Sequence, residues 1–219
     1  MLVSVTGLIG SGKDTVADYL VQNYNFKRVS FAGALKDAVS CIFGWDREMI
    51  EGKTKASREW REQIDQWWSK RLNIPELSPR WVLQQFGTNV CRAYFHDDIW
   101  IAAVEHRLLN TNENIVISDA RFVNELEAIK RLDGTCFYVE RGELPAWFNW
   151  AMRYNTTTDN EQRTRMRIVG SLPDAEPNPV NCRIHSSEWE WVGFPFDHSI
   201  DNDGTVDELY KKVDSIINL

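Results

Sequence analysis

The spacing of apolar residues along the chain predicts strands that alternate with helices. Short runs rich in β-branched residues are followed by segments in which apolar residues recur every three or four positions. The predicted strands cover residues 2–6, 28–31, 114–119, 135–139 and 198–200. Helices are predicted after them, at about 16–24, 35–42, 79–87, 123–129 and 206–217. This alternation is typical of a three-layer α/β fold, in which helices cover both faces of a parallel sheet of about five strands.

Two segments interrupt this alternation. Residues 45–80 are dense in charge and tryptophan and carry no strand signal. One predicted helical face in this segment holds Trp60, Ile64, Trp67 and Trp68. Residues 142–184 are polar, rich in proline at 173–179, and read as irregular. We therefore expect a single domain over 1–219, with a helical insertion at 45–80 and a second insertion at 142–184.

Composition narrows the classes of protein that this chain can represent. Of its 219 residues, 43% are hydrophobic and 26% are charged, which suits a globular protein with a real core. The formal net charge of −7 argues against a nucleic-acid partner, because such binding depends on basic residues that neutralise phosphates. No apolar run reaches the roughly 20 residues of a membrane helix, and the apolar start has no basic leader, so neither a membrane partner nor a signal peptide is expected.

The four cysteines stand far apart and form no C-x-x-C pair, so neither a disulfide framework nor a zinc knuckle is expected. They are Cys41, Cys91, Cys136 and Cys182. This usage predicts a reducing, cytoplasmic location.

A glycine-rich loop, Gly7–Thr15, follows the first predicted strand and has the pattern G-x-x-x-x-G-K. Glycines let successive backbone N–H groups point inward, and a chain of phosphates sits in such a nest at a helix N-terminus. Lys13 adds a positive charge for the outer phosphates. Because a strand precedes the loop and a helix follows it, a nucleotide-binding P-loop is favoured over a chance glycine-rich turn. The predicted ATP-phosphate ligands are Gly10, Ser11, Gly12, Lys13, Asp14 and Thr15.

The position after the lysine departs from the usual pattern. Many P-loops place a metal-binding Ser or Thr there, whereas this chain has Asp14 followed by Thr15. We therefore expect Thr15 to contact the α- or β-phosphate. No direct protein ligand to Mg²⁺ is predicted, and the ion is expected to be held largely by water and the nucleotide.

A P-loop alone is compatible with a motor, a switch GTPase or a small-molecule kinase. The chain has no guanine-reading N-K-x-D, and it is too short and too acidic for a typical DNA-dependent ATPase. A kinase must bring together two phosphate chains that repel each other, so it needs cations around the transferred group. Arginines on segments around the carboxyl edge of the predicted sheet fit this need. They are Arg58, Arg61, Arg92, Arg121, Arg153, Arg163, Arg165 and Arg167.

Several short motifs, taken in order along the chain, resemble those of the bacteriophage deoxynucleoside monophosphate kinases. They are Gly7–Thr15, Phe31–Asp37, Gln85–Thr88 with Arg92 and Trp100, Ser118–Arg121, His185–Glu188 and Ile200–Gly204. Only the first motif is specific by itself, and the ordered set carries the resemblance. The set covers most of the chain except 45–80 and much of 142–184.

The resemblance implies ATP-dependent phosphorylation of deoxynucleoside monophosphates to diphosphates, with Mg²⁺, on a P-loop kinase fold. It implies that Lys13, Arg121 and Asp119 are catalytic residues, with Asp119 orienting the magnesium water shell or the acceptor. The 45–80 insertion would bind the monophosphate, and the 142–184 insertion would close as a lid over ATP. Candidates for binding the monophosphate are Lys36, Arg58, Arg92, Trp100 and Arg121. Candidate lid residues are Arg153, Arg163, Arg165 and Arg167.

Structural explanations of these residues stay open at this point. Asp119 is also a good helix cap, Lys36 could be solvated, and the lid arginines could form a solvated loop. His185 and Glu188 are interpreted as structural, because an acceptor that is already an anion needs no general base. Most of the tryptophans are expected in the core rather than in a base-stacking wall.

Two other functions also stay open. One is another small-molecule P-loop kinase, such as a dephospho-CoA or phosphomevalonate kinase, and the other is a nucleotide-gated binding module. A homodimer is common among such kinases, but the sequence does not decide the oligomeric state.

Overall fold

The computed structural model describes residues 1–109, 111–170, 177–179 and 181–218. They form two compact units, of which the first combines Met1–Val29 with Asn112–Leu219 and the second is Ser30–Thr111. Each unit has its own hydrophobic core. The 45–80 segment lies in the second unit and the 142–184 segment in the first. A single domain with two insertions stays a prediction.

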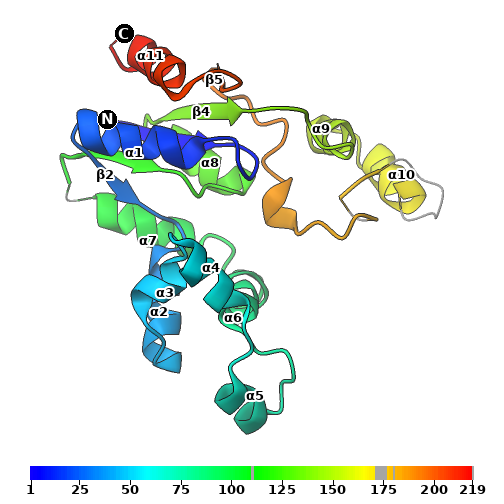
Figure 1. The fold of residues 1–219 in the computed structure, drawn as a ribbon. Coiled ribbons are helices and arrows are strands. Elements are labelled where there is room, and N and C mark those ends of the chain that lie inside the picture. The colour runs from blue at the N-terminus through cyan, green and yellow to red at the C-terminus, as the bar shows by residue number, and fades with distance from the viewer. Residues whose placement is uncertain (110, 171–176, 180, 219) are drawn as a thin grey trace. The chain divides into compact units, whose positions relative to one another are not determined.

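A five-stranded parallel sheet forms the centre of the first unit (Figure 1). Its strands are β1 (Leu2–Thr6), β2 (Phe26–Val29), β3 (Asn114–Ile117), β4 (Thr135–Glu140) and β5 (His198–Asp201). Their spatial order is β2-β3-β1-β4-β5, and every neighbouring pair is parallel. The loops that follow β1, β3 and β4 therefore meet at the carboxyl edge of the sheet, where parallel α/β sheets bind ligands. The predicted parallel sheet of five strands is confirmed.

The predicted bounds of two strands were wrong by two residues. The second strand is Phe26–Val29 rather than 28–31, and the third ends at Ile117 rather than at 119. The pairing of these two strands sets both ends, because Phe26 lies opposite Asn114 and Val29 opposite Ile117. Ser118 and Asp119 therefore lie in the loop beyond β3.

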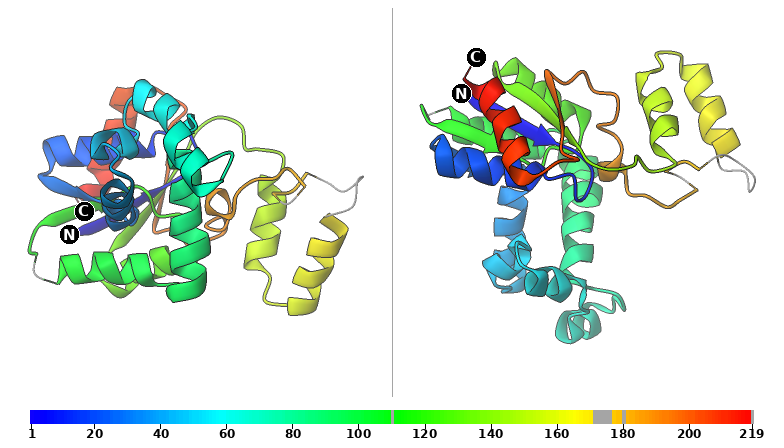
Figure 2. Two further views of the ribbon diagram at one scale, coloured as in Figure 1. Left: turned by 90° about the horizontal axis from the view of Figure 1, so that it is seen from below. Right: turned by 45° about the horizontal axis from the view of Figure 1, so that its top comes forward.

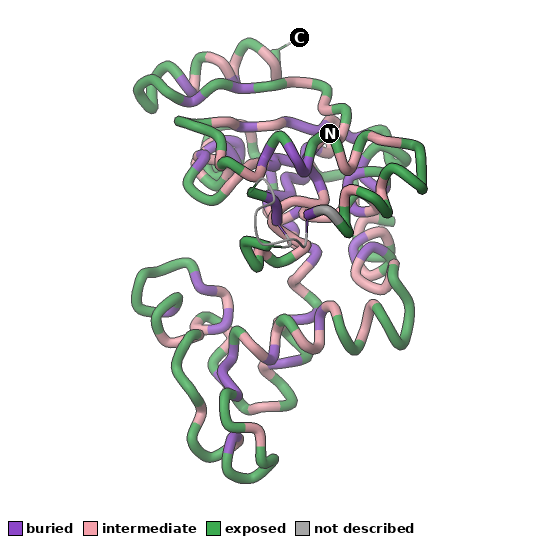
Figure 3. Tube along the Cα trace, turned by 90° about the vertical axis from the view of Figure 1, so that its right-hand side faces the viewer, coloured by how far each residue is buried: buried purple, intermediate pink, exposed green. Residues whose placement is uncertain are grey.

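Helices cover both faces of the sheet (Figures 1 and 2). Helices α1 (Lys13–Asn23) and α11 (Val206–Ile217) bury Val16, Leu20 and Leu209 against one face, and α8 (Val123–Arg131) lies on the other. Figure 3 colours the chain by how far each residue is buried. The predicted capping box of the last helix is confirmed, because Thr205 and Glu208 each accept a backbone N–H from the other. The three-layer α/β fold predicted from the sequence is confirmed.

The second unit is helical. Its helices are α2 (Gly33–Phe43), α3 (Arg47–Glu51), α4 (Lys55–Glu62), α5 (Gln66–Leu72), α6 (Pro79–Gln84), the π-helix η1 (Gln85–Phe95) and α7 (Ile99–Leu108). Trp45 is buried in its core, and Trp60, Trp68, Trp81 and Trp100 pack against that core. Most tryptophans of this unit are therefore core residues, as expected, whereas Trp67 is 63% exposed.

Two helix predictions in the second unit were wrong. Residues 60–68 do not share one helix face, because α4 ends at Glu62, Gln63 is extended, and the Asp65 side chain caps α5. The helix that begins at Ser78-Pro79 does not end at Gly87 but continues as η1. Gly87 allows close packing instead, since a Cβ there would lie 2.8 Å from Leu35 Cδ2.

The prediction that 142–184 is irregular was also wrong. This segment holds α9 (Phe148–Thr156) and α10 (Asn160–Gly170), which lie side by side (Figure 2). The buried face of α9 is aromatic, with Phe148 and Trp150 in the core, and this lowers the polarity contrast that sequence periodicity depends on. Most of the proline-rich stretch at 173–179 lies outside the described residues. The segment continues to a short 3₁₀ turn, η2 (Ser186–Glu188).

Two expectations from composition can be compared with the structure. All four cysteines are free, as predicted. Across the part of the chain that the structure describes, every helix is too short or too polar to cross a bilayer.

Candidate active site

The loop between β1 and α1 has the backbone conformation of a phosphate-binding nest. Gly10 and Gly12 adopt positive φ angles of 84° and 97°, and Gly12 is the N-cap of α1. Positive φ is accessible to glycine at little cost, so the sequence pattern dictates this shape. The free N–H groups of the first turn of α1 therefore stand at the carboxyl edge of the sheet, where they favour an anion.

A buried asparagine from the end of β5 holds this loop in place. Asn202 Nδ2 donates to the backbone oxygen of Ser11 at 2.8 Å. A Cβ on Gly12 would lie 2.3 Å from Asn202 Nδ2, and a Cβ on Gly7 would lie 2.3 Å from the backbone oxygen of Val139. Close packing thus requires glycine at both positions, and at Gly12 the positive φ requires it as well. No role was predicted for Asn202 from the sequence, although this residue lies in the motif Ile200–Gly204.

Lys13 occupies the first turn of α1 and is largely shielded from solvent, with a side chain only 16% exposed. Burial lowers the pKa of Lys13 below its ordinary value of 10.5. Asp14 opposes this shift, Arg121 adds to it, and Glu188 opposes it. Lys13 therefore lies within electrostatic range of a second cation, Arg121, and of two carboxylates, Asp14 and Glu188.

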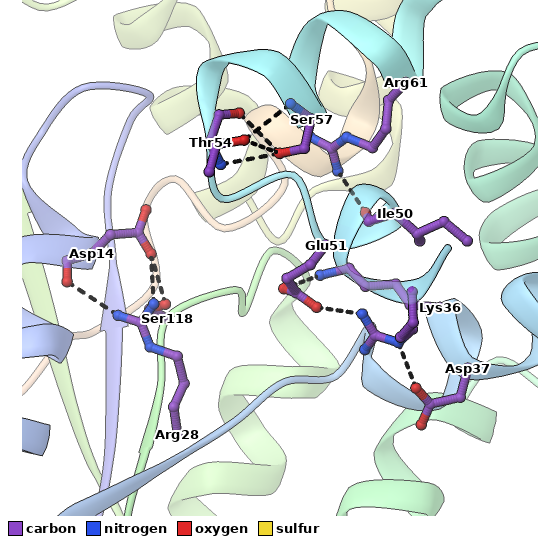
Figure 4. Close-up of polar contacts among 11 residues, drawn as sticks. Asp14, Arg28, Lys36, Asp37, Ile50, Glu51, Thr54, Ser57, Arg61 and Ser118 are labelled. Carbon is purple, nitrogen blue, oxygen red and sulfur yellow. Dashed lines mark hydrogen bonds and ion pairs between the residues drawn. The ribbon is translucent and has the colours of Figure 1, made fainter. Parts of the chain in front are cut away.

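Asp14 is fastened to the sheet by two neighbouring strands (Figure 4). Its Oδ1 accepts a hydrogen bond from Ser118 Oγ at 2.9 Å and lies 3.7 Å from Arg28 Nη1. Arg28 Nη2 also donates to the backbone oxygen of Asp14 at 3.1 Å. The unusual residue after the lysine therefore ties α1 to β2 and to the loop after β3. No role was predicted for Arg28 or Ser118 from the sequence. Both lie far from Asp14 along the chain, and only the pairing of the strands brings them to it.

Arg121 is held by two carboxylates at the start of α8. Its backbone N–H donates to Glu125 Oε2 at 2.7 Å, and its Nη1 donates to Glu188 Oε1 at 2.5 Å. Glu125 also accepts from the backbone N–H of Phe122 and is buried, so it fixes the N-terminus of α8. An arginine side chain carries five N–H donors, and the bond to Glu188 uses only one nitrogen. The guanidinium is therefore positioned while retaining donors for an anion.

Asp119 lies directly beyond the carboxyl end of β3. Ser4 of β1 pairs with Ile117, so Asp119 is level with Thr6, the last residue before the P-loop. The N-cap of the following helix is Phe122, not Asp119. Asp119 therefore does not occupy the N-cap position of this helix, and its catalytic role stays a prediction.

The four remaining candidates for binding the monophosphate lie in the second unit. Lys36 is 13% exposed and pairs with Glu51 at 2.7 Å (Figure 4), and Arg47 pairs with the same carboxylate at 2.6 Å. Lys36 is therefore an ion-paired residue and not merely solvated. Arg58 is exposed and donates to the backbone oxygen of Lys53.

Arg92 lies in the π-helix η1, and Trp100 of α7 is hydrogen-bonded to the same helix. The Arg92 side chain is 8% exposed and pairs with Asp97 at 2.8 Å. Trp100 Nε1 donates to the backbone oxygen of Gly87 at 2.9 Å. A π-helix of this kind is frequent at functional sites, because its extra residue per turn redirects side chains.

The Lys36–Glu51–Arg47 network predicts a pH-dependent stability. Burial alone would raise the pKa of Glu51, but hydrogen bonds from Lys36 and Arg47 outweigh it and lower the pKa from 4.5 to about 2. A depressed carboxyl pKa contributes stability above pH 4.5, and this contribution is lost as the pH falls toward 2. Glu51→Gln is thus expected to lower the thermal midpoint at pH 7, with a difference from wild type that shrinks below pH 4.5.

Thermal unfolding followed by circular dichroism between pH 7 and pH 2 measures this effect. Glu48→Gln on the same helix is the matched control, since Glu48 is exposed. A difference between Glu51→Gln and wild type that stays constant across this range contradicts the prediction.

The four candidate lid arginines have different environments. Arg163 Nη2 donates to the backbone oxygen of Asn155, and its guanidinium lies 5.9 Å from the ring centre of Tyr154. Arg167 is exposed, and Arg163 and Arg167 line one cavity. Arg165 pairs with Glu161 on the surface of α10, where both side chains are at least 80% exposed. Arg153 lines a separate cavity between α9 and α10.

No cluster of three or more His, Cys, Asp or Glu side chains that could hold a metal occurs among the described residues. The predicted ligands include oxygen donors at the carboxyl edge of the sheet, Asp14, Thr15 and Asp119, and oxygen is the ligand type that Mg²⁺ prefers. This donor set fits an ion that arrives with a nucleotide rather than one that the chain binds alone.

The chain is similar to known deoxynucleotide monophosphate kinases. The chain is 32% identical over 155 residues to the "Putative deoxynucleotide monophosphate kinase" of Acanthamoeba polyphaga mimivirus, covering 64% of this chain and 74% of the relative. It is 24% identical over 246 residues to the "Deoxynucleotide monophosphate kinase" of Enterobacteria phage T4, covering 100% and 99% of the two chains. Among solved structures, shikimate kinase from Aquifex aeolicus vf5 matches with 13% identity and a TM-score of 0.45 over 100% of this chain and 96% of that one. No protein-family model matches the chain.

A P-loop after the central strand of a parallel sheet, with its lysine shielded from solvent, defines a P-loop nucleotide-binding protein. The similarity to the mimivirus protein narrows this class. The chain belongs to the deoxynucleotide monophosphate kinase family, and both the resemblance and the enzyme class predicted from the sequence are confirmed.

Proposed function

We propose that this protein transfers the γ-phosphoryl group of ATP to a deoxynucleoside 5′-monophosphate and releases ADP and the diphosphate. The observation that carries the proposal is the nest at Gly10–Thr15, with the shielded Lys13 next to an oriented Arg121. Membership of the deoxynucleotide monophosphate kinase family supports the acceptor class. For a phage-encoded chain, the diphosphates would feed the supply of deoxynucleotides for phage DNA synthesis.

The donor side of the reaction is assigned to the P-loop. Backbone N–H groups of Gly10, Ser11 and Gly12, with Lys13, Asp14 and Thr15, hold the phosphates of ATP. Mg²⁺ bound to ATP neutralises charge on the β- and γ-phosphates. Asp119 and Thr15 orient its water shell, and Asp14 holds α1 against the sheet through Ser118 and Arg28.

The acceptor side is assigned to cations and to one aromatic residue. Arg121 of the first unit, and Lys36, Arg58 and Arg92 of the second, bind the 5′-phosphate, and Trp100 limits the space around the sugar or base. Lys36 and Arg92 already hold carboxylate partners, Glu51 and Asp97. These ion pairs keep long side chains in fixed positions before the substrate arrives, which reduces the entropic cost of binding.

The transfer step needs no general base. An oxygen of the acceptor phosphate forms the new bond to the γ-phosphorus as the bond to the β–γ bridging oxygen breaks, and the electron pair leaves with ADP. Because the acceptor oxygen is already an anion, acceleration comes from positioning and from neutralising charge. The 142–184 segment acts as a lid that excludes water during this step, with Arg153, Arg163, Arg165 and Arg167 as candidate contacts.

A panel of acceptors tests the function. ADP release is measured with each of the four canonical deoxynucleoside monophosphates, the four ribonucleoside monophosphates, dephospho-CoA and phosphomevalonate. We expect release that depends on at least one deoxynucleoside monophosphate and that is far weaker with the other two compounds. Release that depends only on dephospho-CoA or phosphomevalonate would identify another small-molecule kinase. Slow ADP release that no acceptor stimulates would identify a nucleotide-gated binding module.

A homodimer and a cytoplasmic location stay predictions of the sequence. Light scattering coupled to size-exclusion chromatography measures the first.

A further inference from the structure

A cavity in the first unit has no role in the site described above. Its volume is about 560 Å³, and it lies between α9, α10, the turn η2 and the start of α8. The lining residues used in the argument below are Tyr154, Asn155, Arg163, Arg167, Ser186 and Trp189.

The frame of this cavity is fixed by hydrogen bonds that do not involve its interior. Asn155 Nδ2 of α9 donates to the backbone oxygens of Trp189, Glu190 and Val192, at 2.9, 3.3 and 2.9 Å. Arg163 of α10 donates to the backbone oxygen of Asn155 at 3.1 Å. One asparagine thus ties the helix pair to the segment that follows η2, and the walls are formed before any ligand binds.

The cavity walls offer an aromatic platform. Trp150 stacks on Tyr154 with ring centres 4.9 Å apart, and Trp189 meets these two rings at interplanar angles of 75° and 74°. Neither the Trp150 ring nor the Tyr154 ring is therefore stacked face to face on Trp189. Trp150 is buried, whereas Tyr154 and Trp189 are half-buried and line the cavity. Such a platform fits a flat ring system.

Hydrogen-bond donors surround the same space. Arg163 Nε is buried and has no hydrogen-bond partner among the described residues, which is costly unless a ligand supplies an acceptor. Arg167 also lines the cavity, and no hydrogen bond or ion pair joins it to another described residue. Glu190 is the only acidic residue among the described lining residues. The chemistry favours a planar ligand that carries acceptor atoms on its edge.

The cavity is linked to the phosphate site through two short stretches of chain. Val123 lines the cavity two residues after Arg121, and Ser186 lines it two residues before Glu188. Arg121 and Glu188 are joined by their hydrogen bond and both act on Lys13 electrostatically. The two stretches of chain that carry Arg121 and Glu188 therefore also form part of the cavity wall.

We infer that this cavity binds the base of a nucleotide whose phosphates lie at Lys13 and Arg121, an inference that rests on the proposed function. Trp189 provides the stacking face, and Arg163 and Arg167 donate to acceptor atoms of the base. The nucleotide is either the ATP donor or the monophosphate acceptor, since the two share this chemistry. Residues of the lid thus select the base in addition to excluding water.

Binding measurements with and without a base test the inference. Calorimetry compares wild type and Trp189→Leu with four probes: a non-hydrolysable ATP analogue, inorganic tripolyphosphate, dGMP and 2-deoxyribose 5-phosphate. Loss of base stacking is expected to weaken one of the two nucleotides by about 5- to 150-fold, with the matching base-free probe unchanged. Weakening of the ATP analogue identifies the donor base, and weakening of dGMP identifies the acceptor base. Trp189→Phe is expected to restore most of the affinity.

A second variant keeps the test valid if Trp189→Leu fails to fold. Arg167→Gln changes an exposed side chain and is expected to weaken the same nucleotide by about 2- to 12-fold. Arg107→Gln, at an exposed arginine of α7 that does not line the cavity, is the matched control. Unchanged affinity for both nucleotides, or an equal loss for the base-free probes, overturns the inference. These are binding measurements, so they stay informative even where the acceptor panel finds no transfer.

Discussion

Alanine in place of Lys13 is expected to abolish phosphoryl transfer while leaving the fold intact. Lys13 is the only lysine of the P-loop, and its shielded amine interacts electrostatically with Arg121 across the nest. A charge in a site shielded from water stabilises the developing charge of the transferred group more strongly than it would in solution. We expect kcat to fall by at least about 1,000-fold. Coupled measurement of ADP release with the best acceptor of the panel gives this value.

The fold should tolerate the loss of Lys13. Burial lowers its pKa, which means that the charged amine is held at a cost in the folded chain. The thermal midpoint of Lys13→Ala is therefore expected to equal or exceed that of wild type. Lys27→Ala is the matched control, because Lys27 is 64% exposed on β2 and pairs with Glu113. A Lys13→Ala enzyme that still turns over ATP in an acceptor-dependent way contradicts the assignment of the donor site.

The second large effect is expected at Arg121. Its guanidinium is the cation of the first unit that lies beside Lys13 and is held in place by Glu188. Arg121→Ala is expected to lower kcat by about 100- to 1,000-fold, the range found when one donor to a transition-state oxygen is removed. Arg121→Lys keeps the charge but loses the planar fork, so only part of the rate should return. The backbone bond to Glu125 does not depend on the side chain, so α8 keeps its N-terminal cap.

Variants of Glu188 test whether this carboxylate acts by positioning the Arg121 guanidinium or only by stabilising the fold. Glu188→Ala is expected to lower kcat by less than Arg121→Ala, because the arginine remains but loses its fixed orientation. Glu188→Gln retains an acceptor oxygen and should recover part of the rate. In the Arg121→Ala background the change at Glu188 should have little further effect on kcat, as a double-mutant cycle measures. Additive losses, or an Arg121→Ala enzyme within a few-fold of wild type, contradict the role of Arg121.

Local sequence patterns were sufficient to predict the strand, the loop and the helix that together form the P-loop region. The run Leu2–Thr6 is apolar and β-branched, Gly10 and Gly12 require a tight loop, and Val16 and Leu20 recur at helical spacing. Each of these signals depends on neighbours within a few residues, so the sequence shows them directly. The segment 148–170 did not give such a signal, because aromatic residues pack on one another in α9 and obscure its periodicity.

The break between α4 and α5 shows a related failure. Trp60, Ile64, Trp67 and Trp68 have helical spacing, but the side chain of Asp65 caps a new helix. A local hydrogen bond of this kind competes with the continuing helix, and the apolar pattern carries no information about it. The continuation of the helix through Gly87 as η1 is the opposite case, in which packing against Leu35 overrides a helix-ending glycine.

The sequence by itself determined the P-loop, the presence of five parallel strands covered by helices, and the family, because short runs of residue types encode all of these. Only the tertiary structure decided which side chains act together around that loop. Asn202 reaches Ser11, Ser118 and Arg28 reach Asp14, and Glu188 reaches Arg121 across separations of 14 to 191 residues. Such partners are chosen by sheet register and by the paths of connecting loops, and these depend on packing over the whole unit rather than on any local pattern.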